Sequence, residues 1–359
     1  MKISLLALKK SLGLLKGVID FNSQEPVFRH IYVCVNNGLE VRAYNEDIVG
    51  KISLPTKTDD TGGCFVLAKH FISLINSLNG DFVSISFKDS YLGVKCDRSN
   101  YKLQIMNRDE AGNKIEALNE VLFKEFTGEK DILSVGEFSS CFSKISHCLS
   151  TDFEHAELQN VFFWTNKMIG CDGYRGALIP FKTSVLNNFS ISKKVCDCIS
   201  AAAPDSQFIV CVDNDYLGVE CENLIIKTFV YNNYPYSSVS NIVDDFDYKL
   251  GYKIKVKIEP EELKKKLSRI MLFTSEENLV IVQLKQGEII LSLNNENSAE
   301  ETLGIAECSS KEFSVGLDGR VFKDAIQPLL SQTYWLTNGG DDIQYLYDNR
   351  LLQFFLGVE

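Results

Sequence analysis

The stretch Tyr91–Cys96, which reads YLGVKC, occurs again as YLGVEC at Tyr216–Cys221. In both places an alternating apolar run and a short polar turn come first, at residues 82–90 and 208–215. Each copy therefore predicts the same β-hairpin. A third, degraded copy closes the chain at residues 343–356. Three copies at similar spacing indicate an internal repeat.

Each third of the chain predicts the order helix, hairpin, helix, hairpin. Apolar residues recur at three- and four-residue spacing in six segments, residues 3–19, 66–78, 135–149, 191–203, 259–273 and 317–330. Alternating runs between these helices predict antiparallel strands, such as residues 27–35 and 39–49 around Asn36-Asn37-Gly38. Polar connectors at residues 107–119 and 232–247 separate the thirds. We expect an α+β fold of three domains, 1–127, 128–247 and 248–359, each with two helices packed on antiparallel sheet.

The composition argues against several classes of protein. No run approaches the roughly 18 apolar residues that a membrane span needs, and the first residues lack the cleavage site of a signal peptide. The 11 cysteines are scattered, with no CxxC and with Cys196 and Cys198 as the only close pair. This pattern favours buried thiols in a reducing cytoplasm over a metal or redox site. No nucleotide-binding, metalloprotease or hydrolase motif occurs, so we expect no catalytic residue, cofactor or metal.

The net charge of −11, taken alone, argues against a nucleic-acid partner. The field at a surface depends on where the charges lie, so their positions must be considered. The predicted helices carry more lysine and arginine than aspartate and glutamate, so the acidity lies in the rest of the chain. If the helices share one side of the molecule, that side is positive and can contact DNA phosphates. The alternative is that these side chains only solvate exposed helix faces. The residues concerned are Lys9, Lys10, Lys16, Lys69, Lys144, Lys193, Lys194, Lys264, Lys265, Lys266, Arg269 and Lys323.

Three such repeats with basic helices resemble the bacterial β sliding clamp, the processivity subunit of the replicative DNA polymerase, over essentially the whole chain. The most specific match is residues 171–176, Cys-Asp-Gly-Tyr-Arg-Gly, where clamps carry a Thr-Asp-Gly-His-Arg-Leu-type motif. The Asp-Gly and the Arg match, whereas the Thr, His and Leu do not. Two weaker matches are Tyr234-Pro235-Tyr236 and Gly316-Leu317-Asp318. The last residues, 354–359, depart most from the family.

The resemblance implies a homodimer that closes head to tail into a ring, with the helices inside and double-stranded DNA passing through without sequence preference. It also implies that the DNA polymerase and the clamp loader dock short hydrophobic peptides in a cleft between the second and third domains. The cleft residues carried over are Cys171, Gly173, Tyr174, Arg175, Pro235, Val239, Asp318, Phe354, Phe355 and Leu356. The loop of the second repeat at residues 152–155 is acidic, so no DNA role is carried onto it.

Other interpretations stay open at this point. The chain could be an interaction scaffold or decoy with the clamp fold that binds clamp partners without encircling DNA. An enzyme with an unrecognised site is a third hypothesis. Asp172–Arg175 could be a structural turn, and Phe354 and Phe355 could belong to the core or to the cleft. His147 and His155 flank Cys148, but without further ligands a surface or core role is favoured over a metal site.

Overall fold

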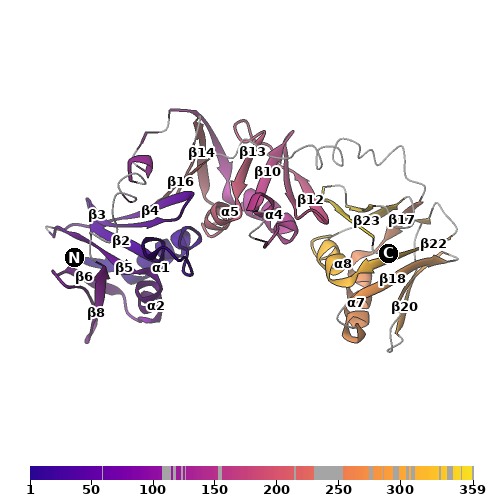
Figure 1. Ribbon diagram of the computed structural model, residues 1–359, viewed down its shortest axis with the longest axis horizontal. Helices are drawn as coiled ribbons and strands as arrows, with labels where there is room; N and C mark the ends of the chain where they lie inside the picture. The colour runs from indigo at the N-terminus through magenta and orange to yellow at the C-terminus, as the bar shows by residue number, and fades with distance from the viewer. Residues whose placement is uncertain are drawn as a thin grey trace. The chain divides into compact units, whose positions relative to one another are not determined.

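The computed structural model (Figure 1) gives the fold of this chain. It describes residues 1–359 with the exception of 59, 107–114, 116–118, 123, 126, 153–155, 214–215, 230–253, 275–277, 286, 294–298, 305–306, 309–311, 331–332, 338–342, 349 and 358–359. The α+β fold class is confirmed.

The described elements follow one order three times: strand, helix, four strands, helix, three strands, with a short extra strand in the last round. The first round contains β1 Lys2–Ser4, α1 Leu5–Leu15, η1 Lys16–Val18, η2 Pro26–Arg29, β2 His30–Val35, β3 Gly38–Tyr44, β4 Ile48–Pro55, β5 Gly63–Leu67, α2 Ala68–Ser77, β6 Phe82–Phe87, β7 Tyr91–Cys96 and β8 Ser99–Met106.

The second round contains β9 Glu129–Ser134, α4 Val135–Ile145, η3 Ser146–Cys148, η4 Ala156–Gln159, β10 Asn160–Trp164, β11 Lys167–Cys171, β12 Arg175–Pro180, β13 Phe189–Ser192, α5 Lys193–Ser200, β14 Gln207–Asp213, β15 Tyr216–Cys221 and β16 Leu224–Phe229. The third contains β17 Ile254–Ile258, α7 Pro260–Ile270, η5 Met271–Phe273, β18 Leu279–Lys285, β19 Glu288–Ser292, β20 Glu300–Gly304, the extra β21 Glu307–Cys308, β22 Glu312–Asp318, α8 Gly319–Ile326, β23 Thr333–Thr337, β24 Gln344–Tyr347 and β25 Leu352–Phe355.

The chain forms two compact units, and each contains one junction between consecutive rounds. The first unit comprises Met1–Ser140, Thr183–Asn187 and Ile191–Tyr231, and the second comprises Cys141–Lys182, Asn188–Ser190 and Asn232–Glu359. In the first unit β4 pairs with β16 inside a 12-stranded sheet. In the second unit β12 pairs with β25 inside a 9-stranded sheet. The three predicted domain limits stay predictions, and the one at 247 lies outside the described residues.

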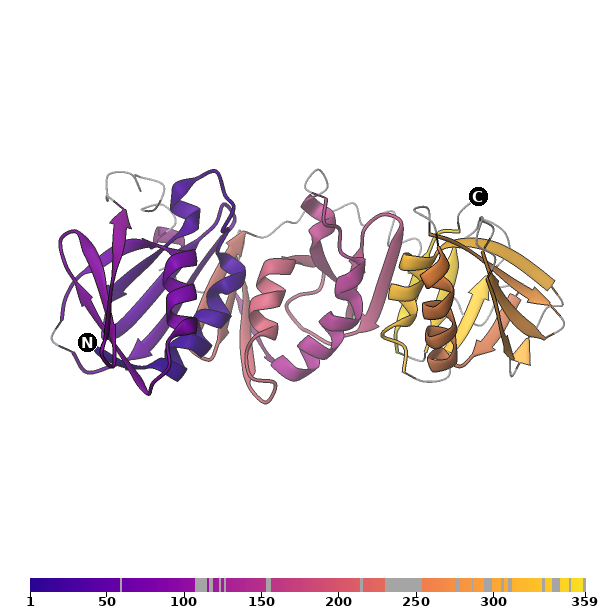
Figure 2. The same ribbon diagram turned by 90° about the horizontal axis from the view of Figure 1, so that it is seen from below.

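The helices of each unit pack against one another over the strands. In the first unit α1 contacts α2, α5 and strand β4, and in the second α7 contacts α8 (Figure 2). Local sequence explains where they begin. The Ser4 hydroxyl accepts a hydrogen bond from the N–H of Ala7 at the start of α1, and α7 starts at Pro260, whose missing N–H costs nothing in the first turn.

Several predicted elements were longer than the observed ones. The first helix was predicted over residues 3–19, but α1 ends at Leu15 and η1 follows, because Lys16–Val18 tighten into a 3₁₀ turn. The helix predicted to begin at Val66 begins at Ala68, because the preceding residues form β5. The strand predicted over residues 27–35 begins only at His30, because η2 precedes it, and η4 precedes β10 in the same way in the second round. The six predicted helices are all present.

The closing element of each round is a three-stranded meander, not the predicted hairpin. The repeated hexapeptides form its middle strands, β7 and β15. The structural counterpart in the third round is β24, Gln344–Tyr347. The third copy was therefore placed one strand too late in the sequence analysis, because Leu351 onward corresponds to the last strand of the meander. The error arose because β23 was missing from the prediction.

Ten cysteines are free and buried in the described part of the chain. Burial raises the pKa of Cys34 to about 11 and that of Cys64 to about 12. Thiolate is the reactive form, so these groups are poor nucleophiles. No helix among the described residues is long and apolar enough to cross a membrane.

We expect the native protein to react rapidly with no more than one equivalent of a chromogenic thiol reagent at pH 8, and the unfolded protein with all 11 cysteines. The count of fast-reacting thiols in the two states measures this. Two or more fast equivalents in the native state would contradict the burial.

Candidate functional site

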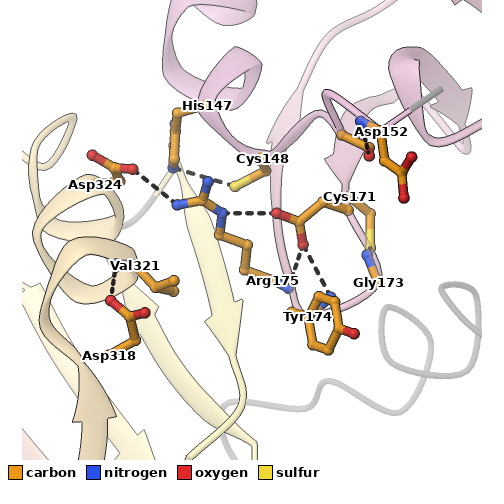
Figure 3. Close-up of polar contacts among 12 residues, drawn as sticks. His147, Cys148, Asp152, Cys171, Gly173, Tyr174, Arg175, Asp318, Val321 and Asp324 are labelled. Atoms are coloured by element: carbon orange, nitrogen blue, oxygen red, sulfur yellow. Dashed lines mark hydrogen bonds and ion pairs between the residues drawn. The ribbon is translucent and has the colours of Figure 1, made fainter. Parts of the chain in front are cut away.

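A tight turn between β11 and β12 holds the motif that the sequence analysis singled out. The Asp172 carboxylate accepts hydrogen bonds from the backbone N–H groups of Tyr174 (3.0 Å) and Arg175 (2.9 Å). Gly173 has φ +94°, a backbone conformation that other residues rarely adopt. As a result the Tyr174 side chain points away from the core and is 75% exposed. Asp172 thus has a structural role in the turn (Figure 3).

Arg175 bridges this turn and helix α8 within the second unit. Its Nε donates to Asp172 Oδ2 and its Nη1 to Asp324 Oδ2, both at 2.9 Å (Figure 3). Burial alone would lower the pKa of Arg175, but the hydrogen bonds to the two carboxylates keep it above its ordinary value. A guanidinium held between two carboxylates is charged and fixed in direction. This geometry lets Arg175 anchor a polar group of a ligand.

His147 and Cys148 lie behind Arg175. The His147 Nε2 is 3.1 Å from the Gln353 Oε1 of β25 and 3.2 Å from the Cys148 sulfur. Burial lowers the pKa of His147 and raises that of the Cys148 thiol. The imidazole is therefore neutral at pH 7 and joins η3 to β25. His155 lies outside the described residues, and no group of three or more His, Cys, Asp or Glu that could hold a metal occurs among the residues described.

The last strand places its two phenylalanines on opposite faces. Phe354 joins an apolar cluster with Phe162 and Tyr345, whereas the Phe355 ring lies 5.7 Å from that of Phe322 on α8. Both rings are buried, and a place for either in the cleft stays a prediction. Leu356, in contrast, is 45% exposed and its N–H donates to the Tyr174 carbonyl.

Gly176 stands where the clamp motif has a leucine, and the structure explains this departure. It lies directly opposite Phe354 in the β12–β25 register. A Cβ added to Gly176 would lie 2.2 Å from the Phe354 ring. The ring thus fills the space that a leucine side chain would need.

The remaining predicted site residues are Cys171, Asp318, Pro235 and Val239. Cys171 is buried beside Phe354. Asp318 caps α8, since its carboxylate accepts from the N–H groups of Arg320 and Val321. Pro235 and Val239 lie outside the described residues.

Sequence reasoning missed Asp324 and Gln353, which hold Arg175 and His147. Neither carries a local signal, because each acts through a residue far away in the chain. The structure brings Tyr174, Arg175, Asp324 and Leu356 together at the β12–β25 junction of the second unit.

Half of the predicted DNA-facing side chains already have a partner. Lys9 donates to the Leu78 carbonyl, and the others form ion pairs or hydrogen bonds with carboxylates: Lys10, Lys193, Lys264, Lys266 and Arg269. Among the described residues no ion pair involves Lys16, Lys69, Lys144, Lys194, Lys265 or Lys323. The side chains of Lys10, Lys193 and Arg269 are about half exposed in these pairs, and exposed pairs contribute little stability. Lys264 and Lys266 are more buried and also donate to backbone carbonyls.

Comparison with known proteins shows what the chain is similar to. Residues 1–113 match the family model described as DNA polymerase III beta subunit, N-terminal domain. The chain is 26% identical to the beta sliding clamp of Mycoplasma pneumoniae over 314 residues, which cover 80% of this chain and 79% of that protein.

Solved structures share the fold over the whole chain. A putative DNA polymerase III beta subunit from Eubacterium rectale superimposes with a TM-score of 0.85 at 15% identity, covering 99% of this chain and 98% of that one. A DnaN sliding clamp from Bartonella birtlesii, solved with griselimycin bound, gives 0.85 at 16% identity, covering 100% and 99%. Residues 1–113 thus match the DNA polymerase III beta subunit family, and the chain as a whole is similar in sequence and in fold to the β sliding clamps of bacterial DNA polymerase III.

Proposed function

We propose that this protein is a non-catalytic sliding clamp: two copies close head to tail into a ring around duplex DNA and tether the replicative polymerase. The observation that carries the proposal is a missing third junction. Each unit contains one junction between consecutive rounds, built from the same two contacts. The surfaces for a third junction lie at the two ends of the repeat and are uncovered, and a second copy supplies their partners.

The first contact is strand pairing. The fourth strand of one round pairs with the last strand of the next, as in β4–β16 and β12–β25. The strands left over are β20 and β8. β20 is the edge of its sheet, and β8 pairs with β5 only through Ile105 and Met106 among the described residues. Residues 99–102 of β8 are exposed, whereas the corresponding β16 and β25 are mostly buried. An exposed sheet edge is a template for pairing with another chain.

The second contact involves the 3₁₀ turn after the first helix of each round. In the first unit η1 packs on α5, and in the second His147 of η3 bonds Gln353. The last residues of these turns, Val18 and Cys148, are 0% and 1% exposed. The corresponding Phe273 of η5 is 49% exposed, and its neighbour Leu272 is 78% exposed. Large apolar side chains exposed at this place in the repeat support a partner surface there.

The two internal junctions also give the register of the third. The bonds Asn45 N–H to Ile48 O, Asp172 N–H to Arg175 O and Leu293 N–H to Ala299 O mark the same hairpin end in each round. Ile48 lies opposite Thr228, and the hexapeptide repeat places Thr228 in correspondence with Leu103. Ala299 is therefore expected opposite Leu103 of the second copy, which puts Glu300 opposite Lys102. A lysine and a glutamate directly opposite stabilise antiparallel pairing.

Cross-linking tests this association directly. With Leu103→Cys and Ala299→Cys in one chain, mild oxidation is expected to give a covalent dimer on a non-reducing gel, because opposed Cα atoms lie within disulfide range. Leu103→Cys with Thr302→Cys is the matched control, since three residues along a strand shift the partner by about 10 Å. Equal yields from the two variants would contradict the register, and no dimer from either would contradict the ring.

The helices are proposed to face the DNA. Their basic side chains would bind its phosphates through counterion release, which does not depend on the base sequence. Support comes from the excess of basic residues on them and from the six lysines that form no ion pair with another described residue. A closed ring needs no strong contact, because its hold on DNA is topological.

The polymerase and the clamp loader are proposed to dock through short hydrophobic peptides at the β12–β25 junction. Tyr174 and Leu356 offer exposed apolar surface there, and Arg175 offers a fixed polar anchor. Such a combination suits an extended peptide.

Arg175→Ala is expected to weaken binding of the C-terminal peptide of the cognate polymerase about tenfold, the effect of losing roughly 1.4 kcal/mol. Isothermal titration calorimetry measures it. Arg98→Ala, an exposed arginine in the β7–β8 turn of the first unit, serves as control. Unchanged affinity in the Arg175 variant would remove this residue from the cleft.

A further inference from the structure

The first meander, β6–β7–β8, and strand β1 beside it have one side that no helix covers. Successive side chains of a strand point to opposite sides of a sheet. On the side that α1 contacts, the buried residues are Ile3, Val83, Ile85, Leu92 and Val94. The opposite side presents the residues that we call the meander surface: Lys2, Phe82, Ser84, Ser86, Tyr91 and Lys95.

The meander surface is distinct from the proposed junction with the second copy. That junction would add a strand beside β8, whereas the meander surface lies on β1, β6 and β7. Lys102 of β8 points to the same side but belongs to the junction, so it is not part of this surface. In the described structure Lys2, Phe82, Ser86 and Lys95 are exposed.

The charge of these strands is opposite to that of the whole protein. Strands β1, β6, β7 and β8 contain three lysines and no aspartate or glutamate, although the chain has a net charge of −11. The nearest acidic residues in the sequence, Asp81, Asp89 and Asp97, lie in the connecting turns, and Lys88 and Arg98 accompany the last two. A local positive field of this kind attracts an anionic partner.

The fold does not require these cations, because the other rounds fill the same positions differently. In the first round one row of paired residues consists of Lys2, Ser84, Lys95 and Asn100. The corresponding row of the second round consists of Ile132, Ile209, Glu220 and Ile225, and that of the third of Lys257, Tyr334, Tyr347 and Leu352. The two lysines in this row are thus a property of the first round alone.

Phe82 adds a flat apolar face to the lysines. Its side chain is 49% exposed, and the Lys2 Nζ lies 4.2 Å from the centre of its ring. An exposed cation–π contact is weaker than the stacking of a base on an aromatic ring, so a base can displace the lysine. The displaced ammonium group is then available to a phosphate. Ser84 and Ser86 are small and leave the surface along β6 flat.

We propose that the meander surface binds a single-stranded nucleic acid without reading its sequence. Lys2 and Lys95 contact phosphates, and the Phe82 ring stacks on a base. A duplex is a poorer partner, because its bases stack on one another and do not reach the ring. An acidic peptide would pair with the lysines but would offer the ring no flat partner. The site lies on the side of the sheet away from the helices, so it is separate from the proposed contact with duplex DNA.

Fluorescence anisotropy with a labelled oligothymidylate of about 12 nucleotides, a length typical of single-strand sites, tests the proposal on the full-length protein. The wild type is expected to bind it saturably at low salt. Lys95→Glu should weaken binding at least about tenfold, because it replaces a phosphate contact by a repulsion. Phe82→Ala should weaken it at least about fivefold through the loss of stacking. Lys95→Glu introduces the residue that the second round has at this position, so the variant is expected to fold.

Lys285→Glu, which makes the same charge change at an exposed lysine of β18, is the matched control and should bind as the wild type does. Absence of saturable binding by the wild type would overturn the proposal, as would equal weakening by Lys95→Glu and Lys285→Glu. A polyglutamate peptide that competes as well as an unlabelled oligothymidylate of the same length would overturn the choice of nucleic acid. Lys95→Glu should stay on circular duplex DNA as the wild type does, which separates this site from the ring.

Discussion

Phe273→Asp is expected to leave this protein monomeric at concentrations where the wild type is a dimer. Phe273 occupies the position at which the two internal junctions bury Val18 and Cys148, yet it is 49% exposed. In the proposed ring its side chain packs on the second copy. A carboxylate there would be buried without a partner and would lose the apolar contact, a cost of about 3 kcal/mol or more. That cost raises the dissociation constant of the dimer about 100-fold or more.

Sedimentation velocity across a concentration series measures this change. Tyr174→Asp is the matched control, because Tyr174 is 75% exposed but lies outside the proposed junction. The control should sediment as the wild type does. A Phe273→Asp dimer of wild-type affinity would exclude η5 from the interface, whereas a wild type that stays monomeric at every concentration would contradict the ring itself.

Gly176→Leu, which restores the leucine of the clamp motif, is expected to destabilise this chain strongly. The Phe354 ring occupies the place of the new side chain, 2.2 Å from its Cβ. The ring cannot move aside cheaply, because it is 4% exposed and packed in the apolar cluster with Phe162 and Tyr345. Overpacking of this kind costs up to about 3 kcal/mol, which lowers Tm by roughly 6–12 °C in a unit of this size.

Two variants control for this prediction. Gly13→Ala adds a side chain on α1 where nothing lies within 4 Å, so Tm should be unchanged or slightly raised. Phe354→Ala removes the obstructing ring, and adding Gly176→Leu to it should restore stability instead of lowering it further. A double variant less stable than either single one would show that the two side chains do not compete for space.

The repeat could be predicted from the sequence because it rests on local patterns. Apolar spacing found all six helices, and the duplicated hexapeptide found the middle strands of the first two meanders. β20 and β23 could not be found in this way. β20 begins with two glutamates, and its edge position leaves little apolar alternation to detect. Missing β23 shifted the third copy by one strand.

The candidate site could be predicted only in part, for the same reason. The Asp-Gly turn and Arg175 follow from a contiguous motif. Asp324, which holds Arg175, is 149 residues away and lies on the exposed side of an amphipathic helix. The pairing of Gly176 with Phe354 depends on the register between two rounds, which no local pattern encodes. Long-range contacts of this kind decide the shape of the site.

Retention on circular DNA tests the central claim most directly. The protein is assembled onto a nicked plasmid by its cognate clamp loader and ATP, and the complex is passed over a gel-filtration column in high salt. The ring predicts that protein stays with the circular plasmid and is lost when a restriction enzyme linearises it, because only the topology holds it once phosphate contacts are screened. Equal loss from circular and linear DNA would contradict the sliding clamp.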